Sequence, residues 1–189
     1  PPSGSPTSNL MDILEKHRGE KHIIVLQDYP DPDAISTALA HQVCCNRFEI
    51  ETNIVYGGRI SHQQNVALVR LLGIELQRHE ASLDLKQYQG AVFLDTQGTT
   101  ATGLVKALAE AKVPKLIVVD HHETQSELDV EFKDIRRSIG STASIYTEYL
   151  KNGLLSLDTA VAEHVKVATA LTHGIITDTG GVVYAKPED

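Results

Sequence analysis

Residues 22–34 read HIIVLQDYPDPDA, an apolar run followed directly by a turn that is rich in acid. The run at 22–26 is short and contains β-branched residues, which favours a strand buried in a parallel sheet. The turn places Asp31 and Asp33 two positions apart in a loop stiffened by prolines. Residues 33–46 then carry apolar side chains at helical spacing. A buried strand, an acidic turn and a helix are therefore predicted at the start of the fold.

The same order of strand and helix recurs along the chain. Further strands are predicted at ETNIVYGG (51–58), GAVFLD (90–95), PKLIVVD (114–120) and, more briefly, near 134–136. Between them, QQNVALVRLLG (63–73) and residues 103–112 are predicted helices. Repeated β–α–β units predict an α/β fold with three layers. We expect a doubly wound, mainly parallel five-stranded sheet with helices on both faces.

Two more helices are predicted in the last third of the chain. TASIYTEYLKNG (142–153) ends at a glycine, and a longer helix runs from Asp158, a favourable N-cap, towards Ile176. We expect the longer helix to face the core with Val161, Val165, Ala168, Thr172 and Ile175. Residues 1–19 are predicted to be an N-terminal lead, disordered over PPSGSPTSN, with a first helix. Residues 20–189 are predicted to form one domain.

Composition excludes several classes of function. The 189 residues are 41% apolar and 22% charged, which suits a globular domain with a real core. The net charge of −8 argues against binding long duplex nucleic acid. No apolar run approaches the ~20 residues needed to cross a bilayer, so membrane insertion is not expected. Cys44 and Cys45 are adjacent and cannot form a disulfide framework, which favours a reducing, cytoplasmic location.

Acidic residues follow three of the predicted strands. The strand at 22–26 leads to Asp31 and Asp33, and the strand at 90–95 ends in Asp95. The strand at 114–120 ends in Asp120, which is followed by His121 and His122. One strand-end Asp is usually a turn former or helix cap, but carboxyl ends of parallel strands meet at one edge. Converging carboxylates repel one another, and a bound cation relieves the repulsion. Asp oxygens with His nitrogens suit Mn²⁺, with Mg²⁺ or Co²⁺ among the rivals.

Asp178 in THGIITDTGG (172–181) is a further candidate ligand. It follows a long helix and precedes two glycines, where the chain can turn sharply. Spacing alone leaves two readings open, a solvated helix end and a contribution to the acidic edge. Two metal ions bridged by one carboxylate, about 3.5–4 Å apart, would clamp a phosphoryl group and activate a water.

Four blocks of sequence, in this order, resemble the DHH phosphoesterase superfamily. YPDPDAI (29–35) resembles its first motif, usually His-x-x-Pro-Asp-x-Asp-Ala, and FLDTQ (93–97) resembles the second. VVDHHETQ (118–125) resembles the third, while GSTASIYTEYL (140–150) and GIITDTGG (174–181) resemble the region that closes the site. The resemblance covers roughly residues 20–186.

The resemblance implies a role for each matching residue. The first metal site would use Asp31 and Asp95, and the second would use Asp33, Asp95, His121 and Asp178, with Asp95 bridging. His122 would face the substrate phosphate as hydrogen-bond donor or general acid, and Asp120 would orient the histidine rings. Gly140, Ser141 and Thr142, where a helix begins, would help to hold the substrate phosphate through backbone amides and hydroxyls. Arg59 follows two glycines at the same predicted edge, and its position leaves a phosphate contact and an ordinary loop arginine equally open.

Gln27 departs from the superfamily pattern, because a histidine normally stands three residues before the proline. A glutamine carbonyl is a weaker ligand than imidazole for Mn²⁺, so we expect the first metal site to be weak or lost. His22 lies at the other end of the first strand and cannot replace it. His17 has no partner spacing and is expected to lie on the surface or half-buried.

The resemblance implies a Mn²⁺-dependent phosphoesterase that hydrolyses phosphodiester or phosphomonoester bonds of short oligonucleotides or small nucleotides. Two alternatives stay open: a phosphoanhydride hydrolase of the inorganic pyrophosphatase or exopolyphosphatase type, and a degenerate domain that senses a nucleotide or metal. Superfamily members usually carry a C-terminal substrate-binding domain. The chain ends at Asp189 without one, so we expect further domains in a longer protein, and a homodimer stays open.

Overall fold

The computed structural model describes residues 4–125, 129–187 and 189, so residues 1–3 of the predicted lead lie outside it. The helices are α1 (Pro6–Lys16), α2 (Pro32–Asn46), α3 (Gln63–Leu72), α4 (Thr102–Glu110), α5 (Thr142–Lys151) and α6 (Ala162–Asp178), with a 3-10 turn η1 (Leu85–Gln87). The strands are β1 (Lys21–Val25), β2 (Glu51–Tyr56), β3 (Leu76–Arg78), β4 (Gly90–Leu94), β5 (Lys115–Asp120) and β6 (Phe132–Ile135). No helix in the described ranges is long and apolar enough to cross a membrane.

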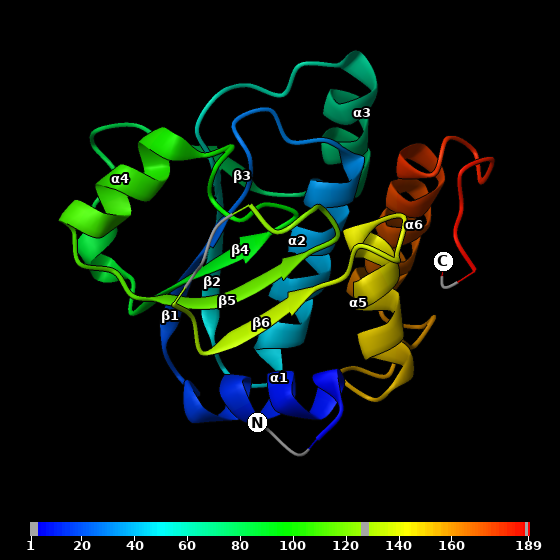
Figure 1. Ribbon diagram of the computed structural model, residues 1–189, viewed down its shortest axis with the longest axis horizontal. Coiled ribbons are helices and arrows are strands. Elements are labelled where there is room, and N and C mark those ends of the chain that lie inside the picture. Colours follow the sequence, from blue (N-terminus) through cyan, green and yellow to red (C-terminus); the bar gives the residue numbers. More distant parts are fainter. Residues whose placement is uncertain (1–3, 126–128, 188) are drawn as a thin grey trace.

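One parallel sheet runs through the molecule, in the order β3-β2-β1-β4-β5-β6 (Figure 1). The chain moves outward from β1 in one direction and returns to β4 on the other side of it. The strand order therefore reverses between β1 and β4, which is where open α/β sheets bind ligands. The predicted α/β class and doubly wound parallel sheet are confirmed.

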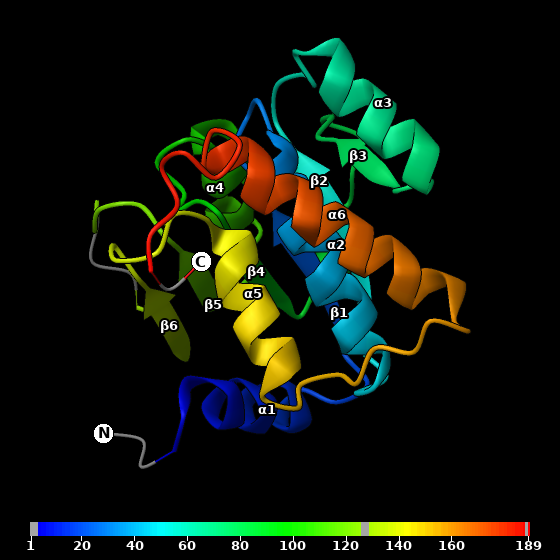
Figure 2. The same cartoon turned by 90° about the vertical axis from the view of Figure 1, so that its right-hand side faces the viewer.

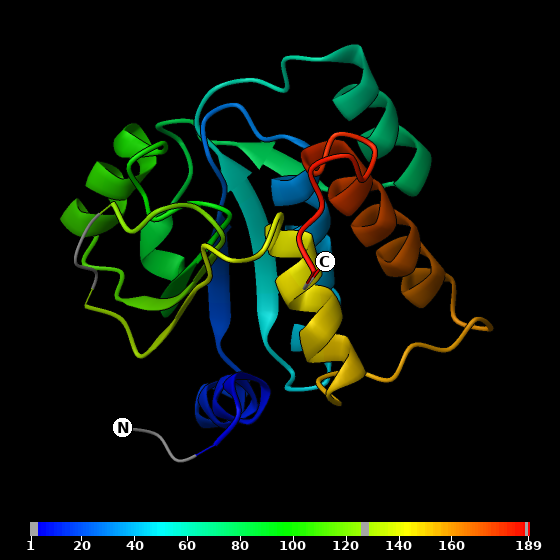
Figure 3. The same ribbon diagram turned by 45° about the vertical axis from the view of Figure 1, so that its right-hand side comes forward.

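Helices cover both faces of the sheet and give three layers (Figure 3). Alternate residues of each strand point to opposite faces. Ile24 and Val92 belong to the larger core under α2, α5 and α6, whereas Ile23 and Phe93 pack with α4 and η1. Figure 2 shows α2, α5 and α6 running over the same face. The larger core thus lies between the sheet and the two elements, α5 and α6, that reach the acidic edge.

Helix α2 is buried on nearly all sides, because it lies between the sheet and helices α5 and α6. Cys44 and Cys45 both lie in this core. Burial raises the pKa of the Cys44 thiol to about 12, which keeps it protonated and unreactive. Both cysteines are therefore packing residues of α2.

The sheet has six strands, one more than predicted. The additional strand, β3, has only three residues, two of which are exposed, and it pairs with β2 alone at the edge. So short a segment shows neither an apolar run nor an alternation, the two patterns that indicate a strand.

The N-terminal segment is helical earlier than predicted. Ser5 caps α1, accepting a hydrogen bond from the Ser8 amide at 3.2 Å, and a proline occupies the first turn. Leu10 and Leu14 are fully buried in the larger core. The prediction of disorder over PPSGSPTSN is therefore wrong from Pro6 onward, because the Ser5 cap and the two buried leucines hold this segment in a helix.

Helix α6 begins at Ala162, not at Asp158. The Asp158 carboxylate accepts a hydrogen bond from the Ala160 amide and closes a turn before the helix. The predicted core face is also wrong: its exposed members are Val161, Val165, Ala168 and Thr172, and Ile175 is only half-buried. The buried residues are Val167, Ala170, Leu171 and Gly174. Two of these are small, so close contact with α2 sets the rotation of the helix rather than its most apolar stripe.

Gly174 marks the closest approach of α6 to its neighbours. A Cβ atom there would lie 2.4 Å from Ser36 Oγ, 3.2 Å from the Pro32 carbonyl oxygen and 3.3 Å from Ala143 Cβ. The Ser36 hydroxyl is itself hydrogen-bonded to the Asp33 carbonyl at 3.1 Å, so it cannot move away freely. Because Asp178 lies one turn beyond Gly174 on the same helix, this contact also places Asp178.

We expect Gly174→Ala to destabilise the protein by about 1–2 kcal/mol. Overpacking typically costs about 1–3 kcal/mol, and the better helix propensity of Ala returns about 0.5–1 kcal/mol. Urea unfolding followed by circular dichroism measures the difference. Gly103→Ala is the matched control, since Gly103 in α4 has no atom within 4 Å of its added Cβ. A Gly174→Ala protein as stable as the control would contradict the close packing of α6 on α2.

Candidate metal centre

The carboxyl ends of three adjacent central strands bring the predicted residues together. Strands β1, β4 and β5 are neighbours in the sheet, and they are followed by Asp31 and Asp33, by Asp95 and by His121 respectively. Asp178 arrives from the last residue of α6. Asp33, Asp95, His121 and Asp178 converge on one point and are called the rim cluster below.

Asp33 lies in the first turn of α2, and its buried carboxylate faces the start of α5. Its two oxygens accept hydrogen bonds from the amides of Thr142, at 2.8 Å, and Ala143, at 2.7 Å. Amides in the first turn of a helix have no hydrogen-bond partner within the helix, and they carry partial positive charge. Burial and the charges of Asp178 and Asp31 nevertheless raise the pKa of Asp33 to about 7, because the amides offset only part of the penalty.

Asp95 lies directly after β4 and is 2% exposed. Its backbone φ is +57°, a left-handed conformation that costs about 1–3 kcal/mol in a residue other than glycine. One carboxylate oxygen, Oδ1, accepts a hydrogen bond from the Thr142 hydroxyl at 2.9 Å. The other, Oδ2, is buried with no hydrogen-bond partner in the described chain. Burial, then the charges of Asp33, Asp31 and Asp120, raises the pKa of Asp95 well above its ordinary value.

His121 Nε2 lies in the middle of the rim cluster. It is 3.3 Å from Asp178 Oδ2, 3.5 Å from Asp95 Oδ1 and 3.7 Å from Asp33 Oδ2. The nitrogen is buried and forms no hydrogen bond with any described residue. Burial and the neighbouring His122 lower the pKa of His121, so its ring is neutral and has a lone pair to offer. Three carboxylates facing an unpaired imidazole nitrogen are ligand types that could hold a divalent cation.

Asp178 is the most exposed member of the rim cluster. Burial and the charge of Asp31 raise its pKa to about 6, while the nearby His122 acts in the opposite direction. At this edge of the sheet, two groups of three side chains have ligand atoms close enough to share one ion, within 4.8 Å of one another. One contains Asp33, His121 and Asp178, and the other contains Asp95, His121 and His122. The residues expected to form the second metal site are thus together.

His122 is held beside the rim cluster by Asp120. Its Nδ1 lies 2.7 Å from Asp120 Oδ1, and that oxygen also accepts the backbone amides of His121 and His122. This hydrogen bond is the main reason that the pKa of His122 is raised. Burial works to raise the pKa of Asp120, but the bonds from His122 and Gln97 outweigh it and the pKa is lowered. The His122 side chain is 47% exposed, so its ring faces both the cluster and solvent.

Gln97 is a site residue that the sequence did not single out. Its side-chain amide donates to Asp120 Oδ2 at 2.7 Å and to the Glu123 carbonyl at 2.9 Å. Its carbonyl oxygen accepts the Gln125 amide at 2.8 Å. Gln97 therefore fixes both Asp120 and the loop after the histidines. The available signal was its position, since FLDTQ places it two residues after Asp95.

Gln27 and Asp31, expected at the first metal site, are neighbours but stand outside both three-residue groups. The Gln27 amide nitrogen donates to Asp31 Oδ2 at 3.2 Å. The other oxygen of Asp31 accepts the Ala34 amide at 2.9 Å and so caps α2. Both oxygens of Asp31 are therefore engaged in hydrogen bonds.

Two of the residues expected to hold phosphate, Gly140 and Thr142, are bonded to carboxylates, and the other two have different partners. The Thr142 amide and hydroxyl contact Asp33 and Asp95, and the Gly140 amide donates to Asp189 Oδ1 at 2.8 Å. The Ser141 hydroxyl pairs with Ser144 at 2.9 Å. Arg59 is exposed after β2, and its backbone amide donates to the Asp28 carbonyl at 3.0 Å. Their roles in substrate binding stay predictions.

Two basic side chains that the sequence analysis did not single out, Arg137 and Lys186, lie near His122. A surface hollow is lined by His121, His122, Glu123, Arg137, Ser138 and Lys186. The Lys186 ammonium donates to the carbonyls of Arg137, at 2.8 Å, and Ile139, at 3.1 Å, which ties the C-terminal segment to this loop. Arg137 forms an ion pair with Glu123, which lines the same hollow, and Lys186 is the second cation beside the rim cluster.

Known structures share this fold. An exopolyphosphatase-related protein from Bacteroides fragilis is 18% identical, with a TM-score of 0.76, over 95% of this chain and 51% of the other. A protein described as a "putative family II inorganic pyrophosphatase" from Methanococcus jannaschii is 18% identical, with a TM-score of 0.64, over 88% of this chain and 52% of the other.

The sequence matches at the family level as well. It is 35% identical over 170 residues to the uncharacterized protein MJ1633 of Methanocaldococcus jannaschii, covering 88% of this chain but only 32% of that relative. The chain thus spans about a third of the curated relative's length. The family model described as "DHH family, N-terminal domain" matches residues 22–175. This match includes the first acidic turn, the Asp-His-His sequence and most of α6, and the chain therefore belongs to the DHH family.

Proposed function

We propose that this chain is the catalytic domain of a Mn²⁺-dependent phosphoesterase acting on short oligonucleotides or small nucleotides. The observation that carries the proposal is His121 Nε2, buried without a hydrogen bond within 3.7 Å of three carboxylates. A divalent cation would give this lone pair a partner and would neutralise the repulsion among the carboxylates. The unpaired Oδ2 of Asp95 offers a further ligand atom to a second ion.

The donor set favours Mn²⁺. Three carboxylates and one imidazole combine hard oxygen ligands with a nitrogen ligand. Mg²⁺ prefers oxygen ligands with several waters, whereas structural Zn²⁺ sites are usually tetrahedral and richer in nitrogen and sulfur. Co²⁺ is the nearest rival, because it accepts the same mixed ligands.

The residues around the cluster have separate tasks in this proposal. When bound, the metal ions supply charge to polarise a phosphoryl oxygen and to activate a water. Thr142 holds Asp33 and Asp95 at fixed separation, so the ligands need no rearrangement when an ion binds. Asp120 orients the His122 ring, which donates a hydrogen bond or proton to the phosphate of the substrate.

Charge near the site supports a small anionic substrate. Arg137 and Lys186 line the hollow beside His122, where they would meet phosphate oxygens. The chain as a whole carries a net charge of −8, which disfavours a long nucleic acid. A substrate with one or a few phosphates fits both observations.

A phosphoanhydride hydrolase is the second candidate. The two similar solved structures are described as exopolyphosphatase-related and as a pyrophosphatase, although at 18% identity they speak for the fold alone. The same rim cluster and cation pair would also suit pyrophosphate. A metal or nucleotide sensor is the third, and Gln27 at the weakened first site is its support.

We expect Asp95→Asn to reduce Mn²⁺-dependent hydrolysis of a dinucleotide by the full-length protein about 1,000-fold, since metal ions contribute several kcal/mol to such reactions. The metal-free variant should also melt at a higher temperature than the wild type, because one buried, repelling charge is gone. Steady-state kinetics and thermal melts measure the two effects.

Asp28→Asn is the matched control for Asp95→Asn. Asp28 lies on the same acidic turn, outside both groups of candidate ligands, and we expect its activity to stay within about threefold of wild type. Full activity in Asp95→Asn would contradict the proposed role of Asp95 as a metal ligand in hydrolysis. Equal losses in the two variants would show a general effect of charge at the rim.

Gln27→His should strengthen the first metal site. An imidazole beside Asp31 is a better Mn²⁺ ligand than an amide, and we expect at least about tenfold tighter binding of one ion. Calorimetric titration with Mn²⁺ compares the variant with the wild type. Unchanged affinities for every bound ion would show that residue 27 does not contact a metal.

The choice of substrate class is tested by rate constants on the same preparation. We expect kcat/KM for a dinucleotide or nucleotide monoester to exceed that for pyrophosphate and for short polyphosphate. The opposite order would establish the phosphoanhydride hydrolase. If Mn²⁺ binds tightly and neither class is hydrolysed, the sensing role replaces both.

A further inference from the structure

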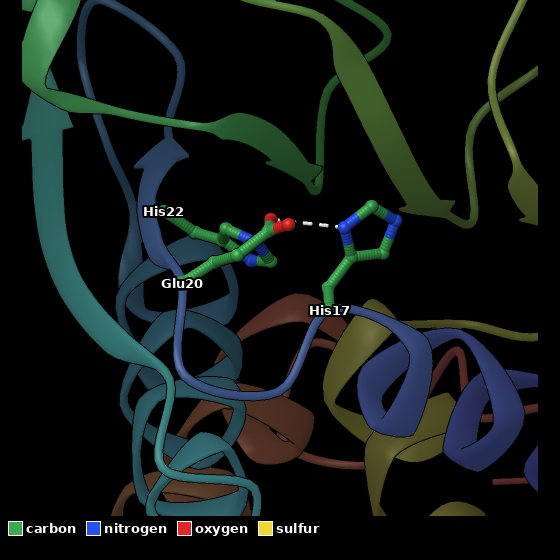
Figure 4. A group of neighbouring side chains, drawn as sticks. All are labelled: His17, Glu20 and His22. Carbon is green, nitrogen blue, oxygen red and sulfur yellow. Dashed lines mark hydrogen bonds and ion pairs between the residues drawn. The ribbon is translucent and has the colours of Figure 1, made fainter.

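A second group of metal-ligating side chains lies at the opposite end of the sheet from the rim cluster. The sequence HRGEKH (17–22) joins the end of α1 to the start of β1. Its positive-φ residue, Gly19 at +80°, lets the chain reverse direction between the two elements. His17, Glu20 and His22, called the α1–β1 cluster below, face one another across this turn (Figure 4).

One carboxylate oxygen lies between two imidazoles. Glu20 Oε2 is 2.9 Å from His17 Nδ1 and 3.0 Å from His22 Nε2. The three ligand atoms lie within 4.8 Å of one another. His22 is 1% exposed, the His17 side chain 12% and the Glu20 side chain 32%, so the two rings are held by packing and the carboxylate remains accessible.

His17 also contacts a second carboxylate, from a distant part of the chain. Its other ring nitrogen, Nε2, lies 3.2 Å from Glu131 Oε2, just before β6. A neutral imidazole carries one N–H and one lone pair, so it can donate to only one of two carboxylates. If Nε2 donates to Glu131, the lone pair of Nδ1 points at Glu20, and a metal ion or a second proton between them makes that contact favourable. A carboxylate bonded to the outer nitrogen of a metal-bound histidine is the usual arrangement in metal sites.

The neighbouring cations do not supply this charge. Lys16 pairs with Glu131 at 2.6 Å, Arg18 with Glu15 at 2.7 Å, and Lys21 with Glu51 at 2.6 Å. All three bases are adjacent in sequence to the α1–β1 cluster, yet each is directed to another acid. Among the described residues, Glu20 Oε2 contacts the two histidines.

We propose that His17, Glu20 and His22 bind a divalent transition-metal ion, Zn²⁺ by preference, that fastens α1 to the start of β1. Two imidazoles and one carboxylate are common Zn²⁺ ligands, and a water would complete a four-coordinate site. In a tetrahedral site with bonds of about 2.05 Å, the ligand atoms stand about 3.3 Å apart. The 2.9 Å and 3.0 Å contacts to Glu20 Oε2 are near this spacing, so small side-chain shifts would admit the ion.

The competing explanation is a proton. His17 doubly protonated could donate to Glu20 and Glu131 together without any metal. A proton and a metal ion compete for the same lone pair, so the two explanations differ in what the protein binds at neutral pH.

The first experiment counts bound Zn²⁺ in protein carrying Asp95→Asn, which weakens the rim cluster. After removal of metal and equilibration with Zn²⁺ at pH 7.5, mass spectrometry of the desalted protein gives the equivalents retained. We expect Asp95→Asn to retain one equivalent more than Asp95→Asn with His17→Gln. His164→Gln is the matched control, because His164 lies near the start of α6 and bonds to Asp158 instead. Equal equivalents with and without His17 would overturn the proposal.

The second experiment uses variants that preserve the shape of the site. Glu20→Gln keeps the size of the side chain and one hydrogen bond but removes the charged ligand, and it should abolish the rise in melting temperature produced by Zn²⁺. Glu131→Gln removes the outer carboxylate of His17, together with its ion pair to Lys16, and should weaken Zn²⁺ binding about 10- to 100-fold. Circular dichroism confirms that both variants are folded. Unchanged Zn²⁺ affinity in both variants would show that the α1–β1 cluster does not bind the ion.

Discussion

The repulsion between Asp33 and Asp95, two buried carboxylates, is the constraint on which the acidic edge of this protein depends. Burial is the main reason that both pKa values are raised. The charges of Asp178 and Asp31 add to the shift of Asp33, and the charge of Asp33 adds to the shift of Asp95. Thr142 bonds to both of them, and the first turn of α5 offers Asp33 two amides. These contacts hold the carboxylates in place without neutralising them. The remaining imbalance is what a divalent cation at His121 would remove.

The fold accepts unfavourable backbone conformation and very close helix packing to build this edge. Asp95 adopts a left-handed backbone conformation as it leaves β4, and Gly174 allows α6 to approach α2 closely enough to deliver Asp178. Such strain persists only where surrounding packing enforces it, and here the two cores on either side of the sheet provide that packing. Stability and the proposed function are therefore opposed at the same residues.

Both ends of β1 carry groups that can bind metal, but for different reasons. At its carboxyl end, several elements deliver mostly carboxylates to an edge where a ligand can enter. At its amino end, a single turn delivers His17, Glu20 and His22, and the imidazoles are packed against the core. The first arrangement suits an ion that meets substrate, and the second suits an ion that holds two elements together.

The sequence by itself determined the α/β class and the order of the strands and helices apart from β3. These follow from local patterns of apolar runs and helical spacing. Acids at the ends of strands, together with the resemblance to the DHH motifs, indicated the rim residues. Tertiary structure alone decided which groups meet. The third strand, the rotation of α6 and the role of Gln97 depend on neighbours far away in the chain.

The histidines at the amino end of the sheet show the physical reason most clearly. His17 had no partner spacing in the sequence, and His22 lay at the wrong end of a strand. Their convergence on Glu20 needs the turn at Gly19, and the second carboxylate on His17 comes from Glu131, which is 114 residues away. Sequence periodicity reports which face of an element is apolar. The distance between two side chains on different elements is set only when those elements pack.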